Sequence, residues 1–413
     1  MGHSMTRRGL VHLGVAAPAL MARSRLVESA PDVPRPPAAV RKLYARTRAD
    51  LADHLTRALP GDHIILAGDT EITGEPIDIA VSGVVLRGTP ILRQRLRVAL
   101  RLLPGTYGNW IWGLRFEDVW NPFNVAGDDH VIGRCRIVRP GGITISAGQC
   151  NRLRVFACEF LGQAPWTAEE RALGAAGGQP KRMHVRYQRD YPRDLHLSRC
   201  LFRGGLRRPI PTSFNSGQPD FLEPGGSGNL GNTATRSTFE HVLLDDHPGY
   251  DLLVEGGALF DCKTSYLRAR HVTIKNTRGR IDIRNGQHCR LEGIWFDDRS
   301  DGTNIHSGYN IVNGWRGGAN AVLRLLSGDQ EWNVSNSGHA YAYRCKLHHV
   351  QGDILLGYRD LPLPPVENRI YAHERGSISV IKEQGTQVFT SSPLAEVVPR
   401  ELTDDDVGCR WGL

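Results

Sequence analysis

The sequence has few aromatic residues, no long hydrophobic run and no closely paired cysteines. Aromatic residues make up 7% of the 413 positions. No segment approaches the roughly 20 apolar residues that a membrane-spanning helix needs, so we expect no membrane partner. The chain has 8 cysteines, but none forms a CxxC pair or another metal-ligand spacing. The cysteines therefore predict neither a zinc site nor a dithiol centre.

Sequence motifs of nucleic-acid-binding proteins are also absent. The chain contains no zinc-finger spacing, no RNP-like motif and no basic amphipathic helix, so we expect no nucleic-acid partner. The charge balance is nevertheless basic, because 51 lysines and arginines exceed 43 aspartates and glutamates by 8. A basic excess favours a polyanionic partner. Polyanionic partners of this kind are nucleic acid, an acidic membrane surface and an anionic polysaccharide, and the missing nucleic-acid motifs weaken the first.

The N-terminal residues 1–30 have features of an export signal. Arg7 and Arg8 precede a mildly apolar stretch that ends in small residues, which is typical of a twin-arginine signal. The stretch is short and contains His12 and Pro18, so a disordered N-terminus is the alternative. The export interpretation predicts a periplasmic or secreted protein.

One helix and then many short strands are expected along the rest of the chain. The apolar residues of 38–59 fall near one helical face, so residues 31–60 are interpreted as a linker and a capping helix. Residues 61–413 read as short strands separated by glycine, asparagine and aspartate. Long glycine- and proline-rich insertions near 163–190 and 204–233 are expected to be loops. Such loops often build the binding face of a solenoid.

Internal similarity indicates a repeat architecture. Six segments share one pattern of alternating apolar residues, with equivalent positions at Cys135, Cys158, Cys200, Val242, Val272 and Ile294. The steps between these positions are 23, 42, 42, 30 and 22 residues. The short steps fit one coil of a solenoid, and the long ones fit one coil plus an insertion, or two coils. Because such coils bury a core only by stacking, the pattern predicts an all-β fold, a right-handed parallel β-helix with an N-terminal capping helix.

A β-sandwich is the weaker alternative for the fold, because a sandwich does not require this period. In the β-helix, the cysteines at matching points would form an interior ladder of small apolar side chains. Disulfides between them are the less favoured interpretation.

One predicted strand carries two arginines on one face. In "GRIDIRNG" (279–286), side chains alternate between faces, so Arg280, Asp282 and Arg284 share a face. Lys263 precedes Arg284 by 21 residues, which is one coil. The two side chains would then lie on neighbouring strands about 4.8 Å apart. Repulsion between adjacent cations favours a neutral lysine, which is a competent general base.

Such a pair suits β-elimination of a uronate polysaccharide. The arginine stays charged and can bind a carboxylate. Neutralising that carboxylate acidifies the adjacent C5 proton, which the base removes while the 4-linked oxygen leaves with help from an acid. A solvated basic face on a solenoid is the alternative interpretation of the same spacing.

Several motifs resemble polysaccharide lyase family 6, the chondroitinase B/alginate lyase family. "ADLADHLTRALPGDHIILAGDTEI" is similar to its opening helix and strand, and "YGNWIWGLRFED" to one of its coils. "CKTSYLRARHVTIKNTRGRIDIRNGQHCRLEGIWFDD" resembles its core. The resemblance covers roughly 50–318 and is most specific around 262–298. It implies a β-helical lyase, with alginate as first substrate and dermatan or chondroitin-type glycans second, Lys263 as base and Arg284 as acid.

The chain departs from the family pattern at two places. Asn285 replaces the histidine of the family's "RHG", so a substrate-contacting group is changed. Gly256 and Ala258 stand where the family commonly has a calcium-binding Glu-x-Glu pattern. Calcium needs several oxygen ligands, usually including carboxylates. Because these acidic residues are absent, we expect no metal and no cofactor, and calcium is the one cofactor that the family would otherwise suggest. Arg280 is then the first candidate for neutralising the substrate carboxylate. Weaker candidates are Arg278 and Lys275.

Other candidates carry less weight. His288 and His306 could contact substrate from the same face, although exposed turn histidines are the alternative. The "GDDH" cluster at 127–130 alone does not support a metal prediction. Aromatic residues that could stack on sugar rings, or equally belong to the core, are Trp110, Trp112 and Trp120.

Two other functions stay open. A β-helical glycoside hydrolase or depolymerase would need paired carboxylates, which Asp245/Asp246 or Asp297/Asp298 could supply. A carbohydrate-binding or adhesive solenoid without catalysis would bind anionic glycans and leave them intact.

Overall fold

The computed structural model describes most of residues 34–206 and separate segments beyond them. The described residues are 34–89, 92–176, 182–187, 194–206, 222–223, 236–246, 258–262, 267–276, 280–283, 290–293, 295–296, 322–325, 346–350, 353–356, 369–372, 378–380, 387–389 and 400–409. Residues Pro36–Leu413 form one compact unit. Within the described part, no helix has the length and apolar character needed to cross a membrane.

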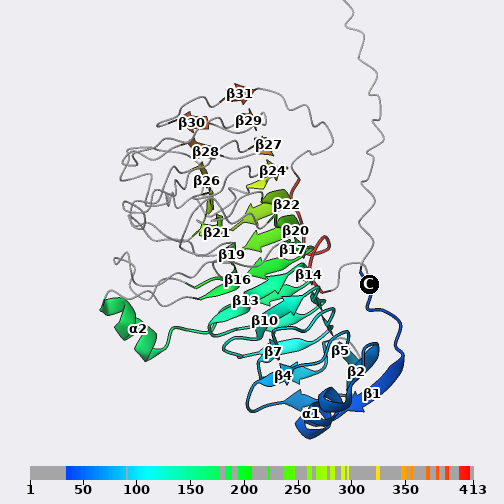
Figure 1. Cartoon of the computed structure of the whole chain (residues 1–413). Coiled ribbons are helices and arrows are strands. Elements are labelled where there is room, and N and C mark those ends of the chain that lie inside the picture. The colour runs from blue at the N-terminus through cyan, green and yellow to red at the C-terminus, as the bar shows by residue number, and fades with distance from the viewer. Residues whose placement is uncertain are drawn as a thin grey trace, which may run out of the picture. The chain divides into compact units, whose positions relative to one another are not determined.

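The described strands form three faces that stack along the chain (Figure 1). The first face holds β2 (Asp62–Ala67), β5 (Val85–Thr89), β8 (Trp110–Trp112), β11 (Val131–Gly133), β14 (Arg154–Phe156), β17 (His196–Ser198), β24 (Arg290–Glu292), β27 (Lys346–Val350), β29 (Arg369–Ala372) and β31 (Gln387–Phe389). The second holds β3 (Glu71–Ile72), β6 (Arg95–Leu96), β9 (Arg115–Glu117), β12 (Arg136–Val138), β15 (Glu159–Leu161), β18 (Leu201–Arg203) and β25 (Trp295–Phe296). Two longer strands run through both faces, β20 (Thr238–Asp245) and β22 (Arg268–Lys275).

The third face is a separate sheet of 11 strands. Its strands are β4 (Ile77–Ile79), β7 (Leu100–Leu102), β10 (Phe123–Asp128), β13 (Ile143–Asn151), β16 (Met183–Tyr187), β19 (Leu222–Glu223), β21 (Ala258–Cys262), β23 (Arg280–Ile283), β26 (Val322–Leu325), β28 (Asp353–Leu356) and β30 (Ile378–Val380). Pairing along it is parallel from one coil to the next. The right-handed parallel β-helix predicted from the repeats is confirmed, and the sandwich alternative is wrong.

The N-terminal cap is shorter in helix than predicted. Residues 38–59 were expected to be helical, but β1 (Arg41–Ala45) pairs in parallel with β2, and α1 starts only at Arg48 and ends at Arg57. The open edge of β2 offers backbone partners that outweigh the helical pattern of residues 41–45. Thr47 begins α1 with a capping box to Asp50, which satisfies backbone N–H groups of the first turn.

A left-handed residue turns the backbone between the first and second faces in five successive coils of the described part. The corner residues, with φ between 47° and 57°, are Arg134, Ala157, Arg199, His241 and His271. Each is followed by a side chain at most 1% exposed: Cys135, Cys158, Cys200, Val242 and Val272. These are five of the positions that the sequence pattern made equivalent. The sixth, Ile294, lies outside the described residues.

The cysteine ladder is present inside the helix. Cys135, Cys158 and Cys200 are buried free thiols. Each Sγ lies 3.3–3.4 Å from the carbonyl oxygen two residues earlier in its own coil. Burial raises the pKa of the Cys135 and Cys158 thiols well above the usual value. These cysteines therefore stay protonated and pack as small core residues.

The first insertion is partly helical, where a loop was predicted. It contains α2 (Ala168–Ala175), which begins with a capping box between Thr167 and Glu170. Arg182 lies later in the same insertion, is fully buried, and donates to Glu170 Oε2 at 2.5 Å. Its guanidinium lies over the rings of Trp120 (4.5 Å) and Trp166 (5.4 Å). The residues of the second insertion, near 204–233, lie mostly outside the described part.

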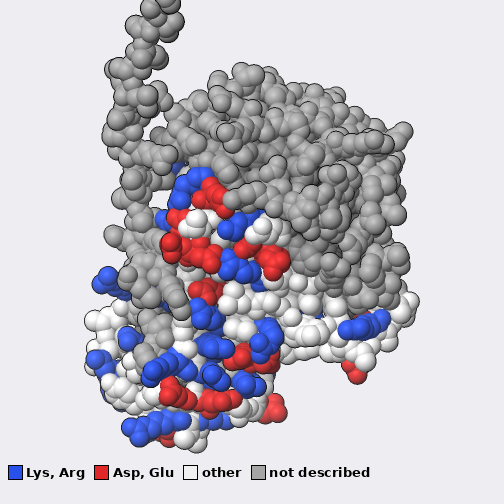
Figure 2. All heavy atoms as spheres, turned by 180° about the vertical axis from the view of Figure 1, so that it is seen from behind, with Lys and Arg blue, Asp and Glu red and all other residues white. Residues whose placement is uncertain are grey.

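Ion pairs connect neighbouring coils across the outside of the helix. Arg136 Nε donates to Glu159 Oε2 at 2.6 Å, and Arg139 pairs with Asp118 at 2.8 Å. These partners are one coil apart in sequence. Figure 2 accordingly shows lysine and arginine interspersed with aspartate and glutamate over the described part of that surface. Most arginines there neutralise carboxylates of the adjacent coil, so the described surface is not a basic stripe.

Residues 400–409 pack along the outside of several coils, where Figure 1 shows them in red. The Leu402 N–H donates to Thr273 Oγ1 at 2.8 Å, and the Cys409 N–H donates to Glu159 Oε1 at 3.0 Å. Leu402 is fully buried. The small apolar cluster around it contains Leu201, Leu243 and Val407. This C-terminal segment therefore joins coils that lie far apart in the sequence.

Candidate active site

The predicted catalytic pair follows two strands of the third face. In the pairing of β21 with β23, Cys262 is the register partner of Ile283. These partners are 21 residues apart, the coil length expected from the sequence. The residues that follow them in the chain are Lys263 and Arg284. Both lie outside the described residues, as do Asn285, His288 and His306.

Arg280 is the first residue of β23, and its register partner is Ala258. Ala258 is one of the two positions where the family commonly has a calcium-binding glutamate and this chain has none. A β-bulge lies between Ala258 and Phe260. The backbone therefore brings an arginine position next to the position that lacks a carboxylate.

Lys275, a weaker candidate for binding the substrate carboxylate, lies on another sheet. It belongs to β22, where it pairs with Asp245 in register. Its Nζ lies 3.7 Å from Glu401 Oε1 in the C-terminal segment. Lys275 is thus part of the packing between β22 and that segment. The other weak candidate, Arg278, lies outside the described residues.

The carboxylate pair considered for a hydrolase is held by structural contacts. Asp245 is 4% exposed, accepts from Arg203 Nε at 2.7 Å and from Asn276 Nδ2 at 2.8 Å. Burial, and then the charge of Asp245, raise the pKa of neighbouring Asp246. Asp245 therefore serves as an anchor between coils. Asp297 and Asp298 lie outside the described residues.

The three tryptophans have different environments. Trp112 is 6% exposed and Trp120 is 52% exposed. A side chain at Gly133 would meet the Trp112 ring at 2.0 Å, so this glycine makes room for it in the core. The exposed Trp120 contacts Arg182 instead. Trp110 is half-buried, with its ring centroid 5.8 Å from that of Trp112. The core interpretation holds for Trp112, whereas Trp120 contacts an arginine that pairs with Glu170 of α2.

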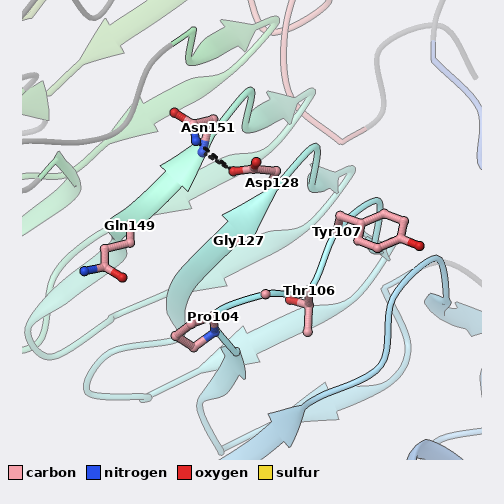
Figure 3. A pocket seen from close by; sticks show the side chains of 8 residues that line it. Pro104, Thr106, Tyr107, Gly127, Asp128, Gln149 and Asn151 are labelled. Atoms are coloured by element: carbon pink, nitrogen blue, oxygen red, sulfur yellow. Dashed lines mark hydrogen bonds between the residues drawn. The ribbon is translucent and has the colours of Figure 1, made fainter.

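A polar pocket opens at the carboxyl ends of β7, β10 and β13, on the sheet that also contains β21 and β23 (Figure 3). Its volume is about 360 Å³. The lining comprises the loop residues 104–107, Gly127 and Asp128 at the end of β10, and Gln149 and Asn151 at the end of β13. Sequence analysis did not find this pocket.

The "GDDH" cluster supplies one wall of the pocket and its support. Asp128 Oδ1 accepts from the Asn151 N–H at 3.1 Å and from Nδ2 at 2.9 Å. Asp129 pairs with Arg152 at 2.6 Å, and this hydrogen bond lowers the pKa of Asp129. His130 is buried, and burial lowers its pKa. Asp128 and Asp129 are thus engaged by neighbouring side chains, and His130 is enclosed in the core. Within the described residues, no group of three or more metal-ligating side chains is arranged to hold a metal ion.

The signal for this pocket in the sequence is weak. Asp128 and Asn151 are 23 residues apart, so the coil period could have predicted that they are neighbours. The β-bulge that separates Gln149 from the regular ladder has no sequence signature of its own. For that reason the pocket emerges only from the three-dimensional register.

Comparison with known proteins identifies the fold. No family model matches the sequence, and no curated protein matches it. The chain is similar to a solved structure of an alginate lyase complex, with 11% identity, a TM-score of 0.55 and coverage of 84% of each chain.

Two further solved structures match at similar levels. A PL6 alginate lyase complex with a trisaccharide has 10% identity and a TM-score of 0.52, over 85% of this chain and 84% of that one. A PL6 family polysaccharide lyase from Pseudopedobacter saltans has 14% identity and a TM-score of 0.52, over 90% of this chain and 100% of that one. These likenesses show that the chain has the fold of PL6 polysaccharide lyases, which is the resemblance that its motifs indicated.

Proposed function

We propose that this protein, which has the fold of PL6 polysaccharide lyases, cleaves a uronate-containing anionic polysaccharide by β-elimination. Alginate is the first substrate, and dermatan or chondroitin-type glycans are the second. Lys263 is the general base and Arg284 the acid. Asn285, His288 and His306 contact the substrate in this proposal.

The observation that carries the proposal is the register of β21 on β23. Cys262 pairs with Ile283, and the next residues in the chain are Lys263 and Arg284. If this pairing continues by one residue, the two basic side chains are neighbours on adjacent coils, about 4.8 Å apart. The charge of Arg284 then favours the neutral form of Lys263, which is the form that accepts a proton.

The proposed chemistry is a proton transfer at each side of the glycosidic bond. Lys263 Nζ removes the C5 proton of the uronate, and the electron pair forms the C4–C5 double bond. The C4–O bond breaks, and the leaving oxygen takes a proton from Arg284. The product carries an unsaturated sugar at its new end. General acid and base groups of this kind typically contribute about 10²–10⁴-fold in rate.

We further propose that this cleavage does not require calcium. The register partner of Ala258 is Arg280, so a permanently charged guanidinium position adjoins the place where an acidic calcium ligand was expected. Arg280 would neutralise the uronate carboxylate directly through charge-assisted hydrogen bonds. No other cofactor is part of the proposal.

The test is the ultraviolet absorbance of the unsaturated product. Wild-type protein is incubated with alginate, dermatan sulfate and polygalacturonate, each with added calcium and with chelator. We expect absorbance to rise with one of the uronate polymers at the same rate in both conditions. Lys263→Ala should lower the rate by at least about 10²-fold.

Lys275→Ala is the matched control, because Lys275 lies in β22, on another sheet than β21 and β23, and pairs there with Glu401 of the C-terminal segment. The Lys275→Ala protein should show the same rate of absorbance increase as wild type. Binding of anionic glycans without any rise in absorbance would favour the non-catalytic solenoid. New reducing ends without absorbance would favour a hydrolase. Activity that disappears with chelator would overturn the calcium-independent part alone.

Export to the periplasm or the medium is the proposed location. Its support is the Arg7-Arg8 pair and the apolar stretch after it. Fractionation of the producing cells tests this, with Arg7→Lys combined with Arg8→Lys as the comparison. Retention of that double variant inside the cell, with export of wild type, is the expected result.

A further inference from the structure

The pocket at the carboxyl ends of β7, β10 and β13 has no role in the proposed bond cleavage. We propose that this pocket binds one sugar ring of the polysaccharide through its hydroxyl groups. The identity of the polymer rests on the proposed function, and the pocket adds a second, remote position at which that polymer is held.

The pocket has the size and polar groups of a small-ligand site. Its volume of about 360 Å³ lies within the range usual for such sites. Asp128 provides hydrogen-bond acceptors, whereas the side-chain amides of Gln149 and Asn151 provide both donors and acceptors. The ring of Tyr107 is 60% exposed beside them. Sugar hydroxyls donate and accept, and sugar C–H groups pack on aromatic rings, so this lining matches a pyranose.

The charge of the lining selects the hydroxyl groups and disfavours the carboxylate of a uronate. None of the eight lining residues is lysine, arginine or histidine, and Asp128 is the one acidic residue. An anionic group placed beside Asp128 would be repelled. A bare cation is also a poor ligand, because Oδ1 already accepts twice from Asn151 and Oδ2 lies 3.6 Å from Arg152 Nη2. A neutral polyol face is the ligand chemistry that fits.

The walls of the pocket are fixed by the backbone. Gly127 has φ 84°, and a Cβ there would meet the Thr106 carbonyl oxygen at 2.1 Å, so only glycine allows β10 to approach the 104–107 loop so closely. Tyr107 and Asp128 form a parallel bridge. These contacts hold the groups in place before a ligand arrives, which lowers the entropic cost of binding.

A β-bulge places Gln149 at the pocket. Val125 pairs with Ala147 and Gly127 with Cys150, so β13 contains one residue more than β10 between these pairs. Bulges redirect side chains and are common beside binding sites. Gln149 is exposed within this bulge. Cys150 is buried with a pKa raised to about 12, so no reactive thiol belongs to the site.

The pocket lies at the carboxyl end of the sheet that contains β21 and β23, the strands that precede the predicted catalytic pair in the chain. Pairing runs from β10 and β13 through β16 and β19 to β21 and β23. The separation is three to five strand steps, which is about 14–24 Å at the usual strand spacing. A polysaccharide lying across these strand ends would span both positions with a few sugar rings.

The experiment uses the full chain with Lys263→Ala, so that oligosaccharides bind without being cleaved. Isothermal titration measures the affinity for alginate oligosaccharides of increasing length, starting with a trisaccharide. Adding Tyr107→Ala or Gln149→Ala should weaken binding of the long oligosaccharides about tenfold, the loss expected for one good contact. Tyr44→Ala is the matched control, because Tyr44 is 55% exposed in β1 and lies outside the pocket.

The two proposals can fail separately. Equal affinity of the Tyr107→Ala, Gln149→Ala and Tyr44→Ala proteins for every length would overturn the pocket proposal, while wild-type cleavage in the absorbance assay would still support the lyase. Equal weakening for the trisaccharide and the long chains would also overturn a remote position. Absence of all binding to the Lys263→Ala parent, with no wild-type cleavage, would overturn both.

A second ligand tests the preference for hydroxyl groups. Long oligosaccharides whose carboxylates have been reduced to alcohols should bind the parent more weakly, because the catalytic end loses its anionic partner. Gln149→Ala should still lower that remaining affinity about tenfold. An effect of Gln149→Ala that disappears with the reduced ligand would mean that the pocket recognises the carboxylate, contrary to the proposal.

Discussion

The imidazole rings of His241 and His271 stack on each other, with centroids 4.9 Å apart and planes inclined by 29°. Both residues occupy the left-handed corner of successive coils, and both are buried. Burial, followed by the charge of Arg199, lowers the pKa of His241 to about 3. His241 is therefore neutral in the folded protein above about pH 3.

This low pKa predicts loss of stability in acid. The unfolded chain protonates His241 near pH 6.5, and the folded protein does so only near pH 3. The unfolded state therefore binds more protons between these values. The free energy of unfolding should fall as pH decreases from about 6.5 towards 3, by up to about 1.4 kcal/mol per pH unit from this group.

Urea unfolding of His241→Asn across this pH range checks the prediction. Asparagine tolerates the left-handed backbone, so the corner should be retained, and the pH slope should be shallower than in wild type. His196, for comparison, is half-exposed and pairs with Glu240 outside the stacked pair. His196→Gln should therefore keep the part of the pH slope that comes from His241. An unchanged slope in His241→Asn would show that other groups cause the acid sensitivity.

Removing the apolar anchor of the C-terminal segment should destabilise the protein. Leu402 is fully buried and packs with Leu201 and Leu243. Leu402→Ala should lower the free energy of unfolding by about 2–5 kcal/mol, as expected for a buried leucine. Leu173→Ala in α2 is the control, because Leu173 is 50% exposed, and its effect should stay within about 0.5 kcal/mol. Equal effects in urea titration would contradict tight packing of the segment.

The negative charge of Glu159 should contribute more to the free energy of unfolding than its hydrogen bonds alone. It is 7% exposed and accepts from Arg136 and from the Cys409 N–H. Glu159→Gln leaves the Arg136 guanidinium without its counter-charge, and we expect a loss of about 3 kcal/mol. In the exposed pair of Glu71 and Arg97, Glu71→Gln should cost less than about 1 kcal/mol. Thermal or urea unfolding of the two variants compares a buried with an exposed pair.

Replacement of Arg280 tests how the substrate carboxylate is neutralised. Arg280→Ala should reduce kcat/KM on the preferred polymer by roughly 10–100-fold, as expected for one lost charge-assisted hydrogen bond. Arg280→Lys should recover part of that loss, because charge is restored without the bidentate geometry. Added calcium should not rescue Arg280→Ala. Full rescue by calcium would show that a metal can occupy the place assigned to the guanidinium.

The repeat pattern predicted the coils because the interior of a β-helix requires an apolar side chain at the same position of each coil. Cys135, Cys158 and Cys200 are small and apolar at the same corner, and the 23-residue step from Cys135 to Cys158 is one coil, whereas the 42-residue step to Cys200 is one coil with the first insertion. The residues of β1 were assigned to the helix because their pattern is locally helical. Only the exposed edge of β2, a tertiary feature, explains why they form a strand.

Features that depend on contacts between distant coils could not be predicted in this way. The pairing of Glu159 with Cys409 joins residues 250 positions apart, and no period connects them. The pocket depends on a one-residue bulge in β13, which changes the direction of Gln149 without changing the sequence pattern. Lys263 and Arg284 stay predictions, supported by the register of the strands that precede them.

The contact of the C-terminal segment with early coils has a consequence for biosynthesis. The Cys409 thiol donates to the carbonyl of Cys135, 274 residues earlier. A ribosome must therefore release the whole intervening chain before this contact can form, although each coil can stack on the preceding one during translation. Long-range closures of this kind are slow steps in folding. Until residues 400–409 have been made, the nascent helix would expose the side chains of Leu201 and Leu243, which the finished protein buries.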